Sequence, residues 1–191
     1  EGGALVVNDA DEAARVERLR FHGIRRNPDG TRDVDVAGGK YNLSDVAARL
    51  GLAQLERLPA WCRARARLAE LYFEAFAGEE LLPPERLPPR DNPGHSWNMF
   101  TVLLPLDRMA IDRKAFMDAM HADGIGTGLS YEAVHLTTLF RSRGWREGRF
   151  PVAERIGRET VTLPLFPEMT ETDVARVAGA VRRHLRSKAK P

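Results

Sequence analysis

A short polar loop directly ahead of an amphipathic helix is the part of this sequence best suited to chemistry. Lys40, Tyr41 and Asn42 follow two glycines, and apolar residues at helical spacing begin at Leu43. The first N–H groups of a helix lack partners within the helix, and its dipole places partial positive charge there. The loop therefore predicts an anion site. From the residues alone, capping of its own helix remains the favoured role for Asn42.

Two cations accompany this polar loop. Arg25 lies within residues 24–39, which hold glycines, a proline and several charges without a period and predict a long exposed loop, and Lys40 follows that stretch directly. Guanidinium and ammonium groups here can pair with a substrate diphosphate, with ordinary solvated charges as the alternative.

Other chemical signatures are absent from the sequence. It contains no GxGxxG, P-loop, HExxH, CxxC or GxSxG pattern. Its five histidines are widely scattered, so no metal site is expected. Cys62 is the single cysteine, which excludes an internal disulfide and fits a reducing, cytoplasmic compartment.

The composition limits the classes of partner that this chain is expected to bind. The 191 residues are 43% hydrophobic and 29% charged, which is typical of a globular protein, and the net charge is +2. Nearly balanced charge argues against nucleic acid or an anionic membrane as the main partner. No apolar run approaches the ~18 residues of a membrane span.

The N-terminal part predicts elements that carry the loop. Residues 4–7 form an apolar run that predicts a buried strand. Asp9 and Glu12 resemble a capping box for a helix that Gly23 ends. Two helices, 43–58 and 60–76, are expected to break at Pro59.

A proline-rich segment, residues 77–95, predicts the domain boundary, since it holds five of the twelve prolines. We expect one domain over residues 1–80, with dimer-contact helices, and a small α+β domain over 95–187.

The second domain alternates strands and capped helices. Strands are expected at 97–104, central in its sheet, at 125–131 and at 161–165. The expected helix starts are Asp112 as a cap, Pro151 at a first turn and Thr170 with Asp173 as a capping box.

Several segments, in order along nearly the whole chain, resemble the DegT/StrS family of sugar aminotransferases. They are Glu1-Gly2-Gly3, Phe21-His22-Gly23-Ile24, Lys40-Tyr41-Asn42-Leu43-Ser44-Asp45, Leu52-Ala53-Gln54-Leu55, His95-Ser96-Trp97, Gly124-Ile125-Gly126-Thr127-Gly128, His135-Leu136, Phe150-Pro151-Val152-Ala153-Glu154 and Leu163-Pro164-Leu165-Phe166-Pro167-Glu168-Met169-Thr170.

The resemblance implies an α/β fold, the C-terminal part of a fold-type I transferase that uses pyridoxal 5'-phosphate (PLP). The end of the large domain and the small domain would be present. In the family, the asparagine at the position of Asn42 reaches the cofactor phosphate of the neighbouring subunit of a homodimer. The lysine that holds the cofactor is expected upstream of Glu1, so this chain alone is expected to be inactive and to contain no catalytic residue.

The same resemblance assigns substrate contacts. His135 matches a histidine that faces the nucleotide-sugar substrate, with a surface histidine as the alternative. Ser130 and Tyr131 stand where many members have histidine and an aromatic residue, so the role of position 130 changes to hydrogen bonding at most. Lys40 and Arg25 complete the expected substrate-binding set.

The motif sequences are most similar to the branch that transfers an amino group, usually from glutamate, to a 4-keto pyranose on UDP for lipopolysaccharide. Two other functions remain open. One is a PLP-dependent sugar dehydratase of the same family, which has histidine at the lysine position. The other is a non-catalytic binding module.

Overall fold

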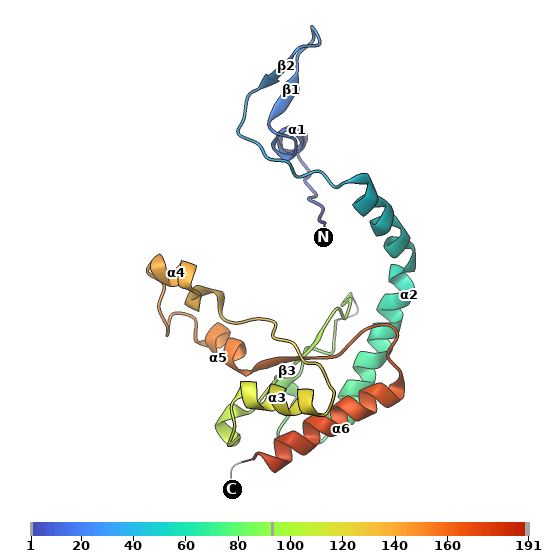
Figure 1. The fold of residues 1–191 in the computed structure, drawn as a ribbon, viewed down its shortest axis with the longest axis vertical. Helices are drawn as coiled ribbons and strands as arrows, with labels where there is room; N and C mark the ends of the chain where they lie inside the picture. Colours follow the sequence, from blue (N-terminus) through green and yellow to red (C-terminus); the bar gives the residue numbers. More distant parts are fainter. Residues whose placement is uncertain (1, 93, 190–191) are drawn as a thin grey trace. The chain divides into compact units, whose positions relative to one another are not determined.

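The computed structural model describes residues 2–92 and 94–189 (Figure 1). Glu1, which opens the Glu-Gly-Gly motif, and Pro93, in the proline-rich segment, lie outside the described residues. The chain divides into two compact units, Glu1–Leu58 and Pro59–Pro191. Each unit is described by itself.

The first unit contains helix α1 (Ala10–Arg20) and a hairpin of β1 (Ile24–Arg26) and β2 (Arg32–Val34). The Asp9 carboxylate accepts a hydrogen bond from the Glu12 N–H at 2.8 Å, which confirms the predicted cap. Gly23 has φ of +71° and its N–H donates to the Arg18 carbonyl at 2.8 Å, so it ends the helix as expected.

Two predictions for the first unit are wrong. Residues 4–7 form no strand, and Leu5 and Val6 are exposed, because no other described segment pairs with them. Residues 24–39 are not an irregular loop, since the hairpin pairs Ile24 with Val34. Its polar strands lack the apolar alternation that marks a buried sheet, which hid them from sequence analysis.

Helix α2 (Asp45–Phe76) is continuous, so the predicted break at Pro59 is also wrong. A proline in a helix removes one backbone hydrogen bond, a cost of roughly 3 kcal/mol that neighbouring interactions can offset. Beyond Pro59, the helix buries Leu68, Tyr72 and Phe76 in the core of the second unit. That packing favours helix on the C-terminal side of the proline.

The sheet of the second unit pairs β3 (Phe100–Leu103) with β4 (Thr160–Leu163), antiparallel. An isolated bridge joins Gly128 to Thr162 on β4. The predicted strands at 97–104 and 161–165 are therefore present in shortened form, whereas the expected strand 125–131 is reduced to one bridge. β4 therefore lies between β3 and Gly128. The prediction that the strand at 97–104 is central in the sheet is wrong.

Four helices complete this unit: α3 (Arg113–Ala122), α4 (Thr138–Ser142), α5 (Pro151–Glu159) and α6 (Glu171–Ser187). Short 3₁₀ turns are η1 (Pro84–Arg86), η2 (Leu106–Arg108) and η3 (Val134–Leu136). All three predicted helix starts are confirmed. Asp112 accepts from Ala115 N–H, Pro151 lies in the first turn of α5, and Thr170 with Asp173 forms a capping box.

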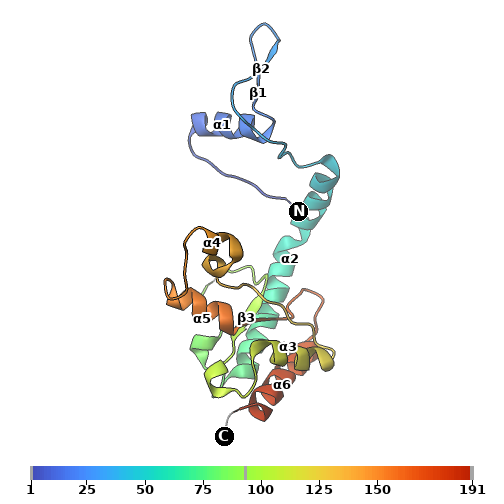
Figure 2. The ribbon, with the colours of Figure 1, turned by 60° about the vertical axis from the view of Figure 1, so that its left-hand side comes forward.

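The core of the second unit lies between the sheet, the end of α2, α3 and α6 (Figure 2). Phe100, Phe116 and Val181 are fully buried there. Tyr72 also donates its hydroxyl to the Pro164 carbonyl at 2.8 Å, and burial raises its pKa. No helix of the described residues is long and apolar enough to cross a membrane.

The proline-rich segment belongs to this core. Leu81 and Leu82 are buried in it, and Leu87 packs against it. By contacts the chain divides between Leu58 and Pro59, before the segment that the prolines indicated. The assignment of residues 1–80 and 95–187 to a large and a small domain stays a prediction.

Candidate functional site

The predicted site residues fall in both units: Arg25, Lys40 and Asn42 in the first, and Ser130, Tyr131 and His135 in the second. In the first unit, two family-like motifs that are far apart in sequence lie together. Phe21 and Lys40 form an antiparallel bridge, and the Tyr41 N–H donates to the Arg20 carbonyl at 2.9 Å. The loop before α2 is thus held against the end of α1.

Two glycines permit this close approach. A Cβ on Gly38 would collide with the backbone of His22 and Gly23, and a Cβ on Gly23 would collide with the Val36 carbonyl. Gly23 also has positive φ, a conformation that L residues rarely adopt. These positions therefore require glycine to present the polar loop.

Asn42 is half-buried, and its Oδ1 is buried without a hydrogen-bond partner among the described residues. It does not cap α2, because Ser44 Oγ accepts from the Ala47 N–H at 3.3 Å. The alternative role as a helix cap is thereby removed. The NH₂ of the same amide is a donor and is not among the buried atoms that lack a partner, so Asn42 can present an N–H to an anion. This amide fits one contact to a phosphate group.

Arg25 and Lys40, the two cations predicted to bind substrate, both make contacts within this unit. Arg25 Nη2 lies 3.1 Å from Asp33 Oδ2, and Arg25 Nε lies 3.8 Å from Asp35 Oδ2. Lys40 Nζ lies 4.3 Å from the centroid of the Phe21 ring, a cation–π contact. Arg25 is thus largely neutralised within the hairpin, whereas Lys40 keeps its charge and is exposed.

The second unit holds an apolar hollow of about 530 Å³, called here the aromatic hollow. Tyr131 is 69% exposed at its margin, and His135 is 8% exposed in its wall. The hollow is also lined by Val134, Phe140, Trp145, Phe150 and Ile156. The hollow therefore brings two of the three predicted residues of this unit together.

Ser130 lies apart from these contacts. Its Oγ accepts a hydrogen bond from Thr162 Oγ1 at 3.0 Å, which ties it to strand β4. It is not among the residues that line the aromatic hollow.

Glu154, on α5, is a residue that the sequence analysis did not select for the site. It is 4% exposed, and its Oε1 lies 2.9 Å from His135 Nε2. Hydrogen bonds from the Gly148 N–H, and then from His135 and Phe150, hold the pKa of Glu154 below its ordinary value, against the effect of burial. Glu154 is therefore ionised at neutral pH. His135 donates through Nε2, which leaves Nδ1 as an acceptor in the neutral ring.

Only a weak signal in the sequence marks Glu154. It lies three residues after Pro151, where the first turn of the helix begins. A glutamate in a first turn is normally a solvated partner of the helix dipole, so its burial could not be read from the sequence.

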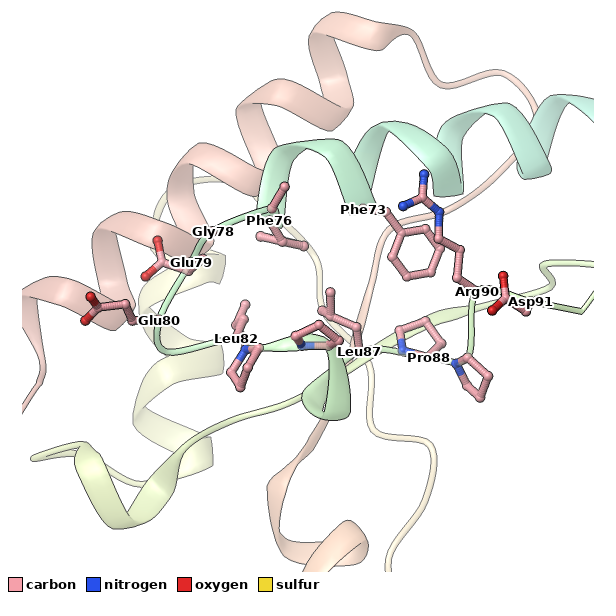
Figure 3. Close-up of a pocket in the computed structure, with 14 residues that line it drawn as sticks. Phe73, Phe76, Gly78, Glu79, Glu80, Leu82, Leu87, Pro88, Arg90 and Asp91 are labelled. Carbon is pink, nitrogen blue, oxygen red and sulfur yellow. The ribbon is translucent and has the colours of Figure 1, made fainter.

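A larger hollow, about 670 Å³, lies between the end of α2 and residues 78–91 (Figure 3). Phe73 and Phe76 on the helix face Leu82, Leu87 and prolines of the segment below. Arg90 lies over the Phe73 ring and pairs with Glu70. This hollow thus offers a mainly apolar wall.

The described residues hold no cluster of three or more side chains suited to a metal.

Known proteins of several organisms are similar to this chain. The uncharacterized protein MJ1066 of Methanocaldococcus jannaschii is 30% identical over 96% of this chain and 49% of its own length. The crystal structure of the aminotransferase TlmJ from Streptoalloteichus hindustanus is 31% identical, with TM-score 0.77, over 94% of this chain and 46% of TlmJ. The chain spans about half the length of these relatives.

Two further solved structures share the fold. DesI, crystallised in the presence of its TDP-sugar product, is 25% identical with TM-score 0.80, over 94% of this chain and 44% of DesI. The pyridoxamine-phosphate (PMP) form of Spr1654 from Streptococcus pneumoniae has TM-score 0.84, over 97% of this chain and 47% of Spr1654. At 19% identity, it shows the fold alone. Fold-type I aminotransferases are thus the structural neighbours. A family profile matches residues 1–182, so the chain belongs to the DegT/DnrJ/EryC1/StrS aminotransferase family.

Proposed function

We propose that the protein containing this chain is a PLP-dependent aminotransferase that acts on a nucleotide-linked keto-sugar. The family match over residues 1–182 carries the proposal. Similarity to the aminotransferase TlmJ and to DesI with its TDP-sugar product supports it. This chain would contribute the phosphate-facing loop of the first unit and the aromatic hollow of the second.

The proposed cofactor is PLP, which supplies an electron sink when bound. Asn42 would hold its phosphate through the NH₂ of its amide, whose Oδ1 has no hydrogen-bond partner among the described residues. The first turn of α2 adds little, because it carries Asp45 and Ser44 already caps it. The lysine that binds the cofactor is expected before Glu1, so we assign that role to no residue here.

Substrate contacts are proposed at five further residues. Tyr131 is exposed, and His135 can accept through Nδ1 while Glu154 orients its ring. Ser130 is a weaker candidate, since Thr162 already donates to its hydroxyl. Lys40 remains available for a diphosphate, whereas Arg25 would first have to leave Asp33 and Asp35.

The finer assignment comes from the motif sequences quoted above. They favour a UDP-4-keto-pentose as acceptor, glutamate as amino donor, a cytoplasmic location, and a product used in lipopolysaccharide or another surface glycan. A sugar dehydratase of the same family is the alternative, and lysine or histidine at the cofactor position upstream distinguishes the two.

Assembly as a homodimer with shared active sites is part of the proposal. The part of α2 in the first unit exposes Leu52, Leu55 and Leu58 at intervals of three residues, an apolar face suited to a two-fold contact. Mixing a full-length lysine variant with a full-length Asn42 variant tests sharing. Partial recovery of activity is expected, and no recovery despite subunit exchange would contradict a shared site.

The activity itself is tested with the full-length protein, PLP and glutamate. We expect the cofactor absorbance to shift to that of the PMP form, and then to return when the keto-sugar nucleotide is added. Absence of both shifts in a protein that retains PLP would refute aminotransfer. Loss of water from the sugar without consumption of glutamate would instead establish the dehydratase.

The role of Asn42 is tested by cofactor retention rather than by turnover. In the full-length protein, Asn42→Ala is expected to weaken PLP binding by about 1–3 kcal/mol, the scale of one hydrogen bond to a charged group. Equilibrium dialysis measures this, with Asn8→Ala as the matched control. Equal affinity in both variants would remove Asn42 from the phosphate site.

A further inference from the structure

Positive charge is concentrated from the last turn of α4 to the start of α5. Residues 141–149, called here the arginine segment, contain four arginines and one glutamate, in a chain whose net charge is only +2. Arg143, Arg146 and Arg149 line a hollow of about 570 Å³ together with Trp145. Neither the substrate residues predicted from sequence nor the proposed cofactor site uses this segment.

Two of these arginines are available to a ligand. Arg146 Nη1 donates to the carbonyl oxygens of Arg141 and Trp145, at 2.9 and 2.8 Å, and so shapes the segment. Within residues 2–92 and 94–189, no carboxylate lies within ion-pair distance of Arg143 or Arg149. Glu147, the acid of the segment, instead pairs with an arginine of α5.

The arginine-lined hollow adjoins the aromatic hollow, because Trp145 lines both. The rings of Trp145 and Phe150 lie 5.5 Å apart between centroids with 36° between their planes. Phe150 in turn meets the His135 ring edge-on at 4.9 Å. An apolar surface rich in π-faces therefore stands beside unpaired guanidinium groups.

Glu154 holds the backbone at the C-terminal end of the arginine segment in place. Its carboxylate accepts the N–H of Gly148 at 2.9 Å and that of Phe150 at 3.1 Å. Gly148 has φ of +87°, so the turn toward α5 needs glycine. The arginine segment thus enters α5 in a defined conformation. The Glu154 carboxylate already accepts hydrogen bonds from Gly148, Phe150 and His135, so it does not pair with the arginines of the segment.

A flat ring beside a diphosphate is the ligand that matches this arrangement. Aromatic side chains stack on nucleobases, and guanidinium groups bind phosphate oxygens in pairs of parallel hydrogen bonds. We propose that the arginine segment and the aromatic hollow bind a nucleoside diphosphate, with the base against Trp145 and the diphosphate at Arg143 and Arg149. The inference rests on the proposed function, since it locates the nucleotide part of that substrate.

Titration of this chain with UDP, followed by calorimetry, tests the proposal. The double variant R143Q/R149Q is expected to bind UDP at least about tenfold more weakly, the scale of losing charge-assisted hydrogen bonds. Arg63→Gln, on α2 and outside both hollows, is the matched control and should bind like the parent chain. Circular dichroism confirms that the variants fold, which is expected because both arginines are exposed.

Two further probes examine each half of the ligand. Uridine and pyrophosphate alone should each bind more weakly than UDP. Trp145→Ala should weaken the binding of UDP but not that of pyrophosphate. Equal binding of pyrophosphate and UDP would overturn the base subsite and hence the proposal. Unchanged UDP affinity in R143Q/R149Q, or no UDP binding by the parent chain, would overturn it as well.

The full-length protein separates this inference from the proposed function. If it transaminates a nucleotide sugar and R143Q/R149Q leaves KM unchanged, the subsite is wrong and the function stands. If it fails to transaminate, yet UDP binding depends on the two arginines, the function is wrong and the subsite stands. A raised KM with unchanged kcat supports both.

Discussion

The two compact units of this chain bury their apolar side chains to very different extents. Among residues 2–58, Gly23 alone is buried, and Leu5, Val6 and Leu50 are exposed. In the second unit, residues such as Phe100 and Val181 are fully buried in one core. The hydrophobic effect therefore stabilises the second unit from within, whereas the first unit owes its local form to caps, turns and glycines.

The contrast also separates the two halves of the candidate site. Within residues 2–58, the loop with Asn42 holds a buried polar atom without a hydrogen-bond partner, and no hydrophobic side chain is buried. The aromatic hollow is supported by the buried hydrogen bond between His135 and Glu154 and by a packed sheet. The first is suited to a contact completed by another surface, and the second to a preformed pocket.

Truncation of a core ring should separate the units most strongly. Phe100→Ala is expected to lower the free energy of unfolding of this chain by about 3–5 kcal/mol, because it leaves a cavity. Leu50→Ala is expected to change it by less than about 0.5 kcal/mol, since that side chain is already in water. Urea denaturation followed by tryptophan fluorescence measures both. Similar losses in the two variants would contradict the contrast.

Limited proteolysis should also distinguish the units. We expect the first cuts within residues 24–39, where the hairpin is exposed. The stretch 77–92 should resist, although the sequence predicted a boundary there, because Leu81 and Leu82 are buried. Mass spectrometry of early fragments identifies the sites. Early cleavage within 77–92 would restore the boundary that the prolines indicated.

Glu154 should make the stability of the second unit depend on pH in the acid range. Its pKa is lowered on folding, so its stabilising contribution is present above the pKa of the unfolded chain and is lost as pH falls through the folded pKa. Glu154→Gln should therefore be less stable near neutral pH and should show a shallower loss of stability below about pH 4. Urea midpoints across that range, with Glu147→Gln as the control, provide the comparison. Parallel curves for parent and Glu154→Gln would refute this role.

The smallest expected effect concerns helix caps. Thr170→Ala removes half of the capping box of α6, which packs into the core, and should cost about 1 kcal/mol of unfolding free energy. Asp9→Ala removes a cap of the same chemistry from α1, which has no buried residue. It should leave the main unfolding transition unchanged and reduce only helical circular dichroism. An equal loss from both substitutions would mean that the units unfold together.

Local signals in the sequence predicted local structure well. Asp9, Asp112 and Thr170 cap helices as expected, since a cap depends on residues within one turn. The helical spacing of apolar residues from Leu43 onward also predicted the helix that α2 forms, because a helical period is read from adjacent turns. Strands were predicted less well. Residues 4–7 lack a partner, and residues 125–131 make a single bridge, and pairing cannot be read from one segment.

The candidate site shows the same division. The polar loop with Asn42 and the family itself follow from ordered motifs in the sequence. By contrast, the burial of Glu154, its bond to His135 and the continuity of α2 through Pro59 came only from the structure. Each of these depends on free energy summed over distant partners.

From the sequence we could predict where helices begin, which faces are apolar and to which family the chain belongs. The tertiary structure decided which of those faces are buried, where the units divide and how Trp145 joins two hollows. The physical reason is that caps and periods act within a few residues. Burial and pairing instead bring together groups such as Tyr72 and Pro164, whose contact only the folded chain creates.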